Sequence, residues 1–247
     1  MIIDIHTRIG QHPLHDFKQE PKELIAIMDE YGIDKSFLLP FPTMRIKENN
    51  DMIAKAVGQN PEHFVGFAGI NPSAEDAPQE LERCVDLGHK GLMIDPEFHK
   101  GPFRDLSKLE VLMVPCVEHS LPVLFNTENI HTMTRLEQPN INSVVGLDSL
   151  AFKFPDVRLI VNCFWPRVGE LMRQHRNIIL YTGGHHNVPG PIPRIEEVGP
   201  MRICLGSESP VNHPALTIRD LSVKKIEPVY RELILGKNSQ RLFNDLL

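Results

Sequence analysis

Side chains that can transfer protons or stabilise charge recur where short apolar segments of this chain end. They are Asp4, His6, Arg8, Asp95, Asn126, Asn162, Cys163, His185, His186 and Glu208. Imidazole and carboxylate groups act as general bases, whereas guanidinium and amide groups stabilise developing negative charge. Because these residues are scattered in the sequence, joint chemistry requires a fold that gathers the ends of the apolar segments.

The apolar segments predict eight β-strands, each followed by a helix or a long connection. Uninterrupted runs of Ile, Val, Leu and Phe are typical of strands covered on both faces, as in a parallel sheet. The expected strands are 2–6, 36–40, 64–70, 92–95, 123–126, 158–163, 178–182 and 203–207. The expected helices are 21–32, 47–59, one from about 73, 106–119, 144–152, 166–175, 214–223 and 227–246, with 189–193 read as a loop.

Alternating strands and helices form either a closed barrel or an open doubly wound sheet. Eight units within 247 residues fit the barrel. The first strand is followed by no G-x-G-x-x-G loop, which an open dinucleotide-binding sheet would carry. We therefore predict an α/β fold, a single-domain (β/α)8 TIM barrel over residues 1–247, with working residues at the carboxyl ends of its strands.

The amino-acid composition limits the classes of partner and the location that we expect for this chain. The chain has 26 Lys and Arg against 32 Asp and Glu, and its net charge of -6 argues against nucleic acid or an anionic membrane as a partner. No apolar run is long enough for a membrane span, and the N-terminus lacks the features of a signal peptide. Four widely spaced cysteines favour reduced thiols and a cytoplasmic location.

Several motifs, in order, resemble the amidohydrolase superfamily. MIIDIHTRIG is similar to the opening strand of its amidohydrolase-related branch, which includes lactonases, decarboxylases and hydratases. LGHKGLMIDP, HSLPVLFNTEN and FPDVRLIVNCFWP resemble the fourth, fifth and sixth strands. NIILYTGG, MRICLGSESP and ILGKNSQRLFNDL resemble the seventh strand, the eighth strand and the closing helix. The resemblance covers nearly the whole chain and implies a TIM-barrel hydrolase with a metal centre.

The positions of that metal centre depart from the family pattern. The family has His-x-His after the first strand, where this chain has His6 and Arg8. The fifth-strand His of the family falls on Asn126 and the sixth-strand His on Cys163. The eighth-strand Asp, a metal ligand and general base in the family, falls on Glu208. The resemblance therefore implies a degenerate metal site.

These replacements change the electrostatics of the site. Arg8 carries a permanent positive charge where the ion should lie, and Asn126 is a poor ligand for zinc. Met93 stands where some relatives carry a bridging Lys. We therefore favour a site that holds no metal ion. In this interpretation Arg8 supplies the positive charge in place of the metal and forms an ion pair with Glu208 across the barrel mouth.

A zinc site with unusual ligands is the alternative. His6, Cys163, Glu208 and one of His185 or His186 form a mixed set that zinc accepts. Against this set, a cysteine is more often a small buried hydrophobic residue than a ligand.

Our leading hypothesis is a small-molecule hydrolase without the usual metal, acting on a lactone, amide or carboxylic acid; some lactonases of the superfamily need no metal. Glu208 would be the base, with His6 and Arg8 as electrostatic partners. The expected substrate contacts are Asn126, His185, Asp95 and Trp165.

Two other hypotheses remain. One is a non-catalytic relative that binds a small acidic ligand, with Arg8 and Glu208 as an inert pair. The other is the zinc hydrolase with the unusual ligands above. Homo-oligomers are common among similar barrels, and the sequence does not name the substrate.

Overall fold

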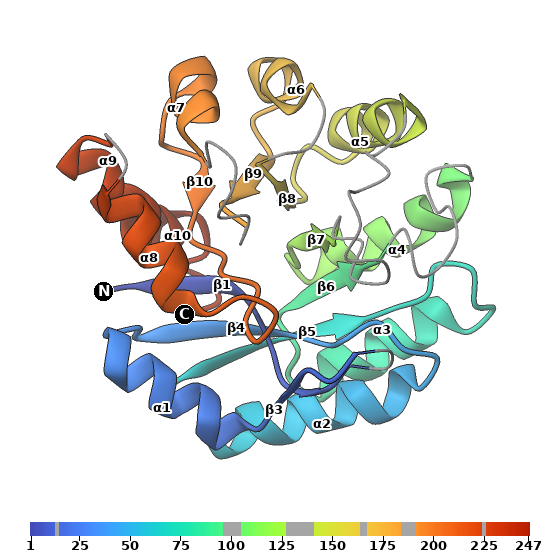
Figure 1. The fold of residues 1–247 in the computed structure, drawn as a ribbon. Helices are drawn as coiled ribbons and strands as arrows, with labels where there is room; N and C mark the ends of the chain where they lie inside the picture. Colours follow the sequence, from blue (N-terminus) through green and yellow to red (C-terminus); the bar gives the residue numbers. More distant parts are fainter. Residues whose placement is uncertain (13–14, 96–104, 127–140, 164–166, 184–190, 224–225) are drawn as a thin grey trace.

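Eight parallel strands lie side by side in the computed structural model, which describes residues 1–12, 15–95, 105–126, 141–163, 167–183, 191–223 and 226–247. Their order around the sheet is β1, β4, β5, β6, β7, β8, β9 and β10 (Figure 1). Their bounds are Ile3–Arg8 (β1), Lys35–Leu39 (β4), Phe64–Gly69 (β5), Gly91–Ile94 (β6), Val123–Phe125 (β7), Leu159–Asn162 (β8), Ile178–Tyr181 (β9) and Ile203–Cys204 (β10). The predicted single-domain (β/α)8 barrel is confirmed.

Strands β1 and β10 close the ring. The Ile5 amide donates to the Leu205 carbonyl at 2.9 Å, and the Glu208 amide donates to the His6 carbonyl at 2.8 Å. Regular strand geometry in β10 ends at Cys204, although a strand to residue 207 was expected. The segment beyond it stays attached to β1 through these single bonds, so the barrel is nearly closed.

Helices follow the strands and cover the outside of the barrel (Figure 1). Their bounds are Pro21–Tyr31 (α1), Ile46–Gln59 (α2), Ala77–Asp86 (α3), Leu106–Glu118 (α4), Ile141–Lys153 (α5), Val168–Gln174 (α6), Ile192–Val198 (α7), Pro214–Val223 (α8), Pro228–Glu232 (α9) and Asn238–Leu242 (α10). None of the helices in the described part of the chain combines the length and apolar character that a membrane span requires.

Four features differ from the sequence-based expectation. The closing helix is split by a π-helical turn, Leu233–Lys237 (η2), where the Ile234 carbonyl also accepts a bond from Leu205 of the barrel. Helix α7 begins inside the predicted loop 189–193, because proline suits the first turn of a helix. Helix α3 begins at Ala77 rather than near residue 73. A short hairpin, Gly10–Gln11 (β2) with Lys18–Gln19 (β3), follows β1.

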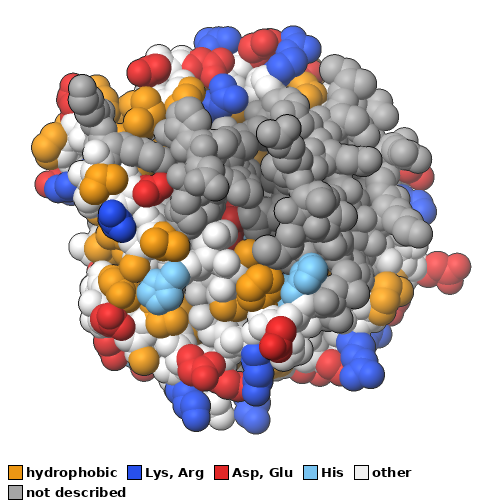
Figure 2. Space-filling view, in the orientation of Figure 1, with side chains coloured by type: hydrophobic (Ala, Val, Ile, Leu, Met, Phe, Trp, Pro, Cys, Tyr) orange, Lys and Arg blue, Asp and Glu red, His pale blue; other side chains and the backbone are white. Residues whose placement is uncertain are grey.

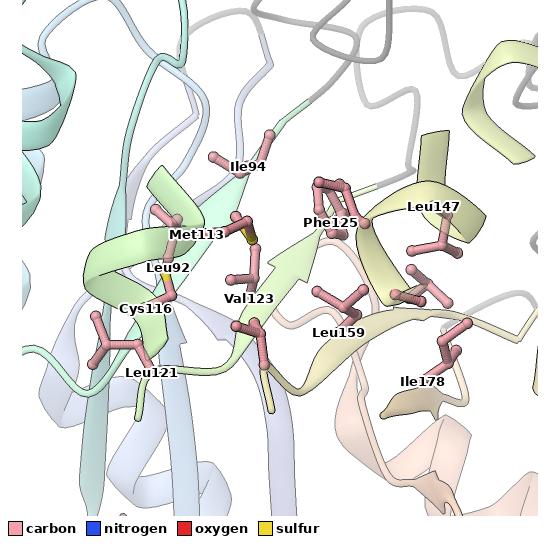
Figure 3. Close-up of a cluster of buried hydrophobic side chains, with 14 of the residues drawn as sticks. Leu92, Ile94, Met113, Cys116, Leu121, Val123, Phe125, Leu147, Leu159 and Ile178 are labelled. Carbon is pink, nitrogen blue, oxygen red and sulfur yellow. The ribbon is translucent and has the colours of Figure 1, made fainter. Parts of the chain in front are cut away.

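Strand side chains alternate between two apolar layers. One layer fills the barrel and includes Phe37, Phe67, Leu124 and Ile160. The other lies between the strands and the helices, and Figure 3 shows part of it, where side chains of β6, β7 and β8 meet those of α4 and α5. Because both faces of each strand are covered, the strands read as continuous apolar runs.

Phe243 forms the floor of the barrel. Its ring is fully buried in the inner layer and meets the Phe37 ring edge-on, with 5.5 Å between centroids. Arg158, which precedes β8, holds the segment around it: the guanidinium donates to the Leu242 carbonyl at 2.8 Å and to both Asp245 oxygens at 2.6 and 2.7 Å. The amino ends of the strands are thereby closed, so access to the interior is left to the opposite end.

A buried polar network joins α2 to α3. The Glu80 carboxylate accepts two bonds from Arg83, both at 2.8 Å, and one from the Asn50 amide at 3.0 Å. Burial alone would raise the pKa of Glu80, but these bonds outweigh it and lower the pKa to about 2. The carboxylate therefore stays ionised over the whole physiological range.

Replacing Phe243 by alanine is expected to lower the free energy of unfolding by about 3–5 kcal/mol, because it removes a buried ring and leaves a cavity. Urea unfolding followed by circular dichroism measures the change. The matched control is Phe152→Ala on α5, whose side chain is 78% exposed; it should change stability by no more than about 0.5 kcal/mol. Equal losses in the two variants would contradict a floor at Phe243.

Glu80→Gln is expected to make the free energy of unfolding less dependent on pH in the acidic range. The folded-state pKa lies below the unfolded value near 4.5, so ionised Glu80 stabilises the protein above that pH. This contribution disappears as the pH falls toward 2. The stability gap between the unaltered protein and the variant should thus be widest near pH 6 and should narrow on acidification. A difference in stability that does not change with pH would show that the charge of Glu80 does not stabilise the folded protein.

Candidate active site

A one-residue bulge in β1 turns two polar side chains into the barrel. Asp4 pairs with Ser36 of β4, but the next paired residues are Thr7 and Leu38, so β1 contains one extra residue. Such an insertion shifts the alternation of side chains along a strand. His6 and the following inward position, Arg8, thereby face the interior at the carboxyl end of β1.

Asp4 lies on the other face and fastens the barrel seam. Its Oδ1 accepts from the Ser207 amide at 3.0 Å and from the His6 amide at 3.1 Å. Burial raises the pKa of this carboxyl to about 6. Asp4 therefore belongs to the β1–β10 seam rather than to the mouth.

The other strands also bring polar residues to the mouth, namely Asp95, Asn126, Asn162 and Glu208. The first three lie two positions beyond inward apolar side chains, such as Leu124 of β7 and Ile160 of β8. Glu208 lies beyond the end of β10, four positions after the inward Cys204. All four are buried, so the mouth is a polar layer on top of the apolar barrel interior.

Glu208 is held in a strained conformation. Its φ is +67°, in the left-handed region that costs a non-glycine residue about 1–2 kcal/mol. The side chain is fully buried, and its two oxygens accept from the amides of Asn162 and Asn212, each at 3.2 Å. A Cβ at Gly183 would lie 2.6 Å from the Asn162 amide nitrogen and 3.2 Å from the carboxylate, so this arrangement needs glycine there.

Asn126 is oriented by Asp95. Its amide nitrogen donates to the Asp95 carboxylate at 2.8 Å. The amide oxygen, which is also buried, makes no hydrogen bond with a described residue. Buried carbonyl oxygens are rarely left in this state, so this atom is available to a ligand.

His6 is a neutral imidazole. Its ring stacks on Tyr181, with 4.7 Å between centroids. Burial, and then the positive charge of Arg8, lower the pKa of His6 well below its usual range. The nearby Asn126 side chain acts in the opposite direction and raises the pKa of His6. Neither ring nitrogen of His6 makes a hydrogen bond of good geometry with a described residue. A neutral ring whose nitrogens make no hydrogen bond with described residues is suited to bind a ligand or a metal ion.

Arg8 is seated against the β4 side of the mouth. The guanidinium is fully buried, donates to the Pro40 carbonyl, lies 3.6 Å from the Met93 sulfur and packs 5.6 Å from the centre of the Phe41 ring. The Arg8–Glu208 ion pair predicted from the sequence is not among the ion pairs of the described residues. The bulge and this seat direct Arg8 toward β4 and β6.

Cys163 lies in the layer between barrel and helices, and its thiol donates to the Thr182 carbonyl at 3.1 Å. Alternation along β8 places Asn162, not Cys163, at the mouth. This position counts against Cys163 as a zinc ligand. The other predicted residues of this region, Trp165 and His185, lie outside the described residues.

Sequence reasoning gave no role to three neighbours of the site. Asn162 was expected at the mouth but without a function, and Asn212 and Tyr181 were missed. Asn212 carries one signal, because it follows Glu208 by one helical turn in sequence. The stacking of Tyr181 on His6 depends on the bulge and has no sequence signal.

A compact group of side chains of the types that ligate metals occurs elsewhere. Glu82, Glu118 and His119 bring their ligand atoms within 4.8 Å of one another on the exposed surface of α3 and α4. In the described part of the chain, no group of three His, Cys, Asp or Glu ligands is this compact at the mouth. The donors facing the mouth are nevertheless an imidazole, two carboxylates and an amide oxygen, a set that suits a divalent cation such as manganese.

A model of the amidohydrolase family matches residues 36–244. The chain belongs to the amidohydrolase family. The matched segment holds the carboxyl-terminal mouth residues from Asp95 to Glu208, whereas His6 and Arg8 precede it.

Solved structures with the same fold include several decarboxylases. The chain is similar to 5-carboxyvanillate decarboxylase from Sphingomonas paucimobilis, at 16% identity over 98% of each chain and a TM-score of 0.76. It is similar to 2,6-dihydroxybenzoate decarboxylase from Rhizobium, at 17% identity over 98% of each chain and a TM-score of 0.74. A dihydroxybenzoic acid decarboxylase from Polaromonas, at 17% identity over 98% of this chain and 96% of that chain with a TM-score of 0.76, contains manganese and 2-nitroresorcinol. These likenesses show the fold, and the bound manganese gives no support to our expectation that a metal is absent.

Glu208→Gly is expected to raise the free energy of unfolding by about 1 kcal/mol or more, because it relieves the left-handed strain and removes a buried polar group. Ser120→Gly is the matched control: Ser120 has φ +55° but is exposed. Thermal and urea unfolding of both variants measure the gains. A destabilised Glu208→Gly beside a stabilised Ser120→Gly would identify the carboxylate as a structural tie.

Proposed function

We propose that this chain is a small-molecule hydrolase of the amidohydrolase type, in which Glu208 acts as the base. The observation that carries the proposal is the strained, fully buried carboxylate of Glu208, held between two asparagine amides at the barrel mouth. Strain of this kind persists where the surrounding structure over-determines it, and it clusters at active sites.

The proposed reaction uses the described side chains as follows. Glu208 takes a proton from water, the water oxygen adds to a lactone or amide carbonyl carbon, and the proton passes to the leaving atom as its bond to carbon breaks. Neutral His6 and the charge of Arg8 stabilise the negative oxygen that forms. Asn126, ordered by Asp95, contacts the substrate. His185 and Trp165 remain proposed substrate contacts on the basis of the sequence alone.

The donor set at the mouth also fits a divalent metal. His6, Glu208, Asp95 and the Asn126 oxygen would hold it, and the ion would polarise the substrate carbonyl. The position of Arg8 supports this fit. Its guanidinium contacts Pro40 and Met93 on the β4 side of the mouth, so its positive charge is directed toward that side.

Decarboxylation of a small aromatic acid is the second candidate. It is favoured by the activity of the decarboxylases above, which share the fold along nearly their whole length. In that reaction the bond to the carboxyl carbon breaks, carbon dioxide leaves, and a proton is added to the ring carbon. Glu208 and His6 are the groups of the described mouth that would handle this proton, and Arg8 would bind the carboxylate.

We also propose a cytoplasmic location and a small-molecule ligand, with a homo-oligomer as a further expectation. The four cysteines support the first, because all are buried free thiols. The small molecules bound in the related structures support the second.

Turnover of a panel of lactones, amides and aromatic acids, with and without added manganese, tests the proposal. Glu208→Gln should lower kcat/KM by at least about 10²-fold and abolish the limb of the pH–rate profile assigned to the base. Release of a new carboxylic acid identifies hydrolysis, and release of carbon dioxide identifies decarboxylation.

The matched control is Glu232→Gln, which removes a surface carboxylate paired with Lys237. It should leave both turnover and the pH profile unchanged. Full activity in Glu208→Gln would refute the role of this residue, and thermal stabilisation by panel compounds without any turnover would favour the non-catalytic relative.

A further inference from the structure

The backbone of Gly69, at the end of β5, is clamped by one side chain of α2. The amide oxygen of Asn50 accepts from the Gly69 amide at 2.9 Å, and its amide nitrogen donates to the Gly69 carbonyl at 3.1 Å. Asn50 is fully buried and bonds both backbone groups of one residue, as a neighbouring strand would. This clamp fixes the end of β5 in position and orientation.

The clamped residue lies directly against the seat of Arg8. A Cβ at Gly69 would be 2.6 Å from Cγ of Pro40 and 3.7 Å from the terminal methyl of Met93. The Pro40 carbonyl accepts from the Arg8 guanidinium, and the Met93 sulfur lies 3.6 Å from it. A shift of the Gly69 peptide would therefore displace the groups that hold Arg8.

The clamp is itself held from outside the barrel. The Asn50 amide nitrogen also donates to Glu80, which Arg83 grips with two bonds. The Asn50 carbonyl lies 3.1 Å from a ring nitrogen of His89. Side chain and backbone of Asn50 are thus both fixed, and the amide cannot rotate without breaking its charge-assisted bond to Glu80.

We propose that Asn50 is a positioning residue for Arg8, acting through the Gly69 backbone and the Pro40–Met93 seat, with Glu80 holding Asn50 in place. The role of Arg8 toward substrate rests on the proposed function, but its position does not. Asn50 lies on α2, outside the barrel, and contacts Arg8 only through this chain of groups.

Asn50→Asp tests the proposal with little change in shape. The substitution replaces the amide nitrogen by an oxygen, so the Gly69 carbonyl and Glu80 would each face a second acceptor. The first readout is the NMR resonance of the Arg8 Nε–H group, assigned by its loss in Arg8→Lys. We expect this resonance to shift or broaden in Asn50→Asp. An unchanged Arg8 resonance would overturn the proposal, whatever the activity of the protein.

Asn60→Asp is the matched control, because Asn60 follows the same helix and its side-chain amide donates to the Ala56 carbonyl at the end of that helix. It should leave the Arg8 resonance unchanged. Glu80→Gln keeps an acceptor for Asn50 and should shift the resonance less than Asn50→Asp does. If Asn50→Asp does not fold, as judged by circular dichroism, Asn50→Ala removes the clamp without adding repulsion and is measured instead.

The kinetic readout is a double-mutant cycle with a substrate from the panel. Asn50→Asp should raise KM roughly 10- to 100-fold with a smaller change in kcat, and this effect should disappear in an Arg8→Met background. Additive effects would overturn the proposal. An Arg8→Met variant with unaltered kinetics would instead refute the proposed function of Arg8 and leave the NMR result to decide the positioning.

Discussion

The bulge in β1 is the constraint on which the mouth of this barrel depends. Without its extra residue, regular alternation would turn His6 and Arg8 toward the outer layer of helices and turn Thr7 inward. The stacking of His6 on Tyr181 and the seat of Arg8 would then have no partner inside. The same segment carries Asp4, whose bonds to the β10 side keep the seam closed at the level of the bulge.

Backbone strain and buried polar atoms are concentrated at the mouth, and both destabilise the fold. The packed layers around the mouth offset this cost. Glu208 occupies a left-handed conformation, and His6 and Asn126 keep polar atoms that no described residue satisfies. Below them lies an apolar barrel interior closed at its far end, and beside them the network around Glu80 and Asn50 fixes the end of β5. A rigid support of this kind lets groups remain poised for a ligand at a cost in stability.

Much of the fold was predictable, because the spacing of apolar residues along the sequence differs between buried strands and amphipathic helices. The mouth positions of Asp95 and Asn126 followed from the strand ends, since parallel strands bring those ends together. Three aspects of the site were not predictable. Cys163 was expected at the mouth together with Asn162, because the family resemblance places the sixth-strand ligand at this position; in the structure Cys163 packs in the outer layer. The bulge has no sequence mark, and the approach of Asn212 to Glu208 depends on the turn between them.

The position of Phe243 has a consequence for how the protein is made. The ring that closes the inner core is translated after all eight strands, and β10, which completes the circle with β1, also emerges late. While the chain is still attached to the ribosome, the strands already made can pair with their neighbours, but the core they enclose lacks its floor and its seam. Completion of the barrel therefore requires that residue 243 has been translated, and a nascent chain stalled before it would present apolar strand faces to chaperones.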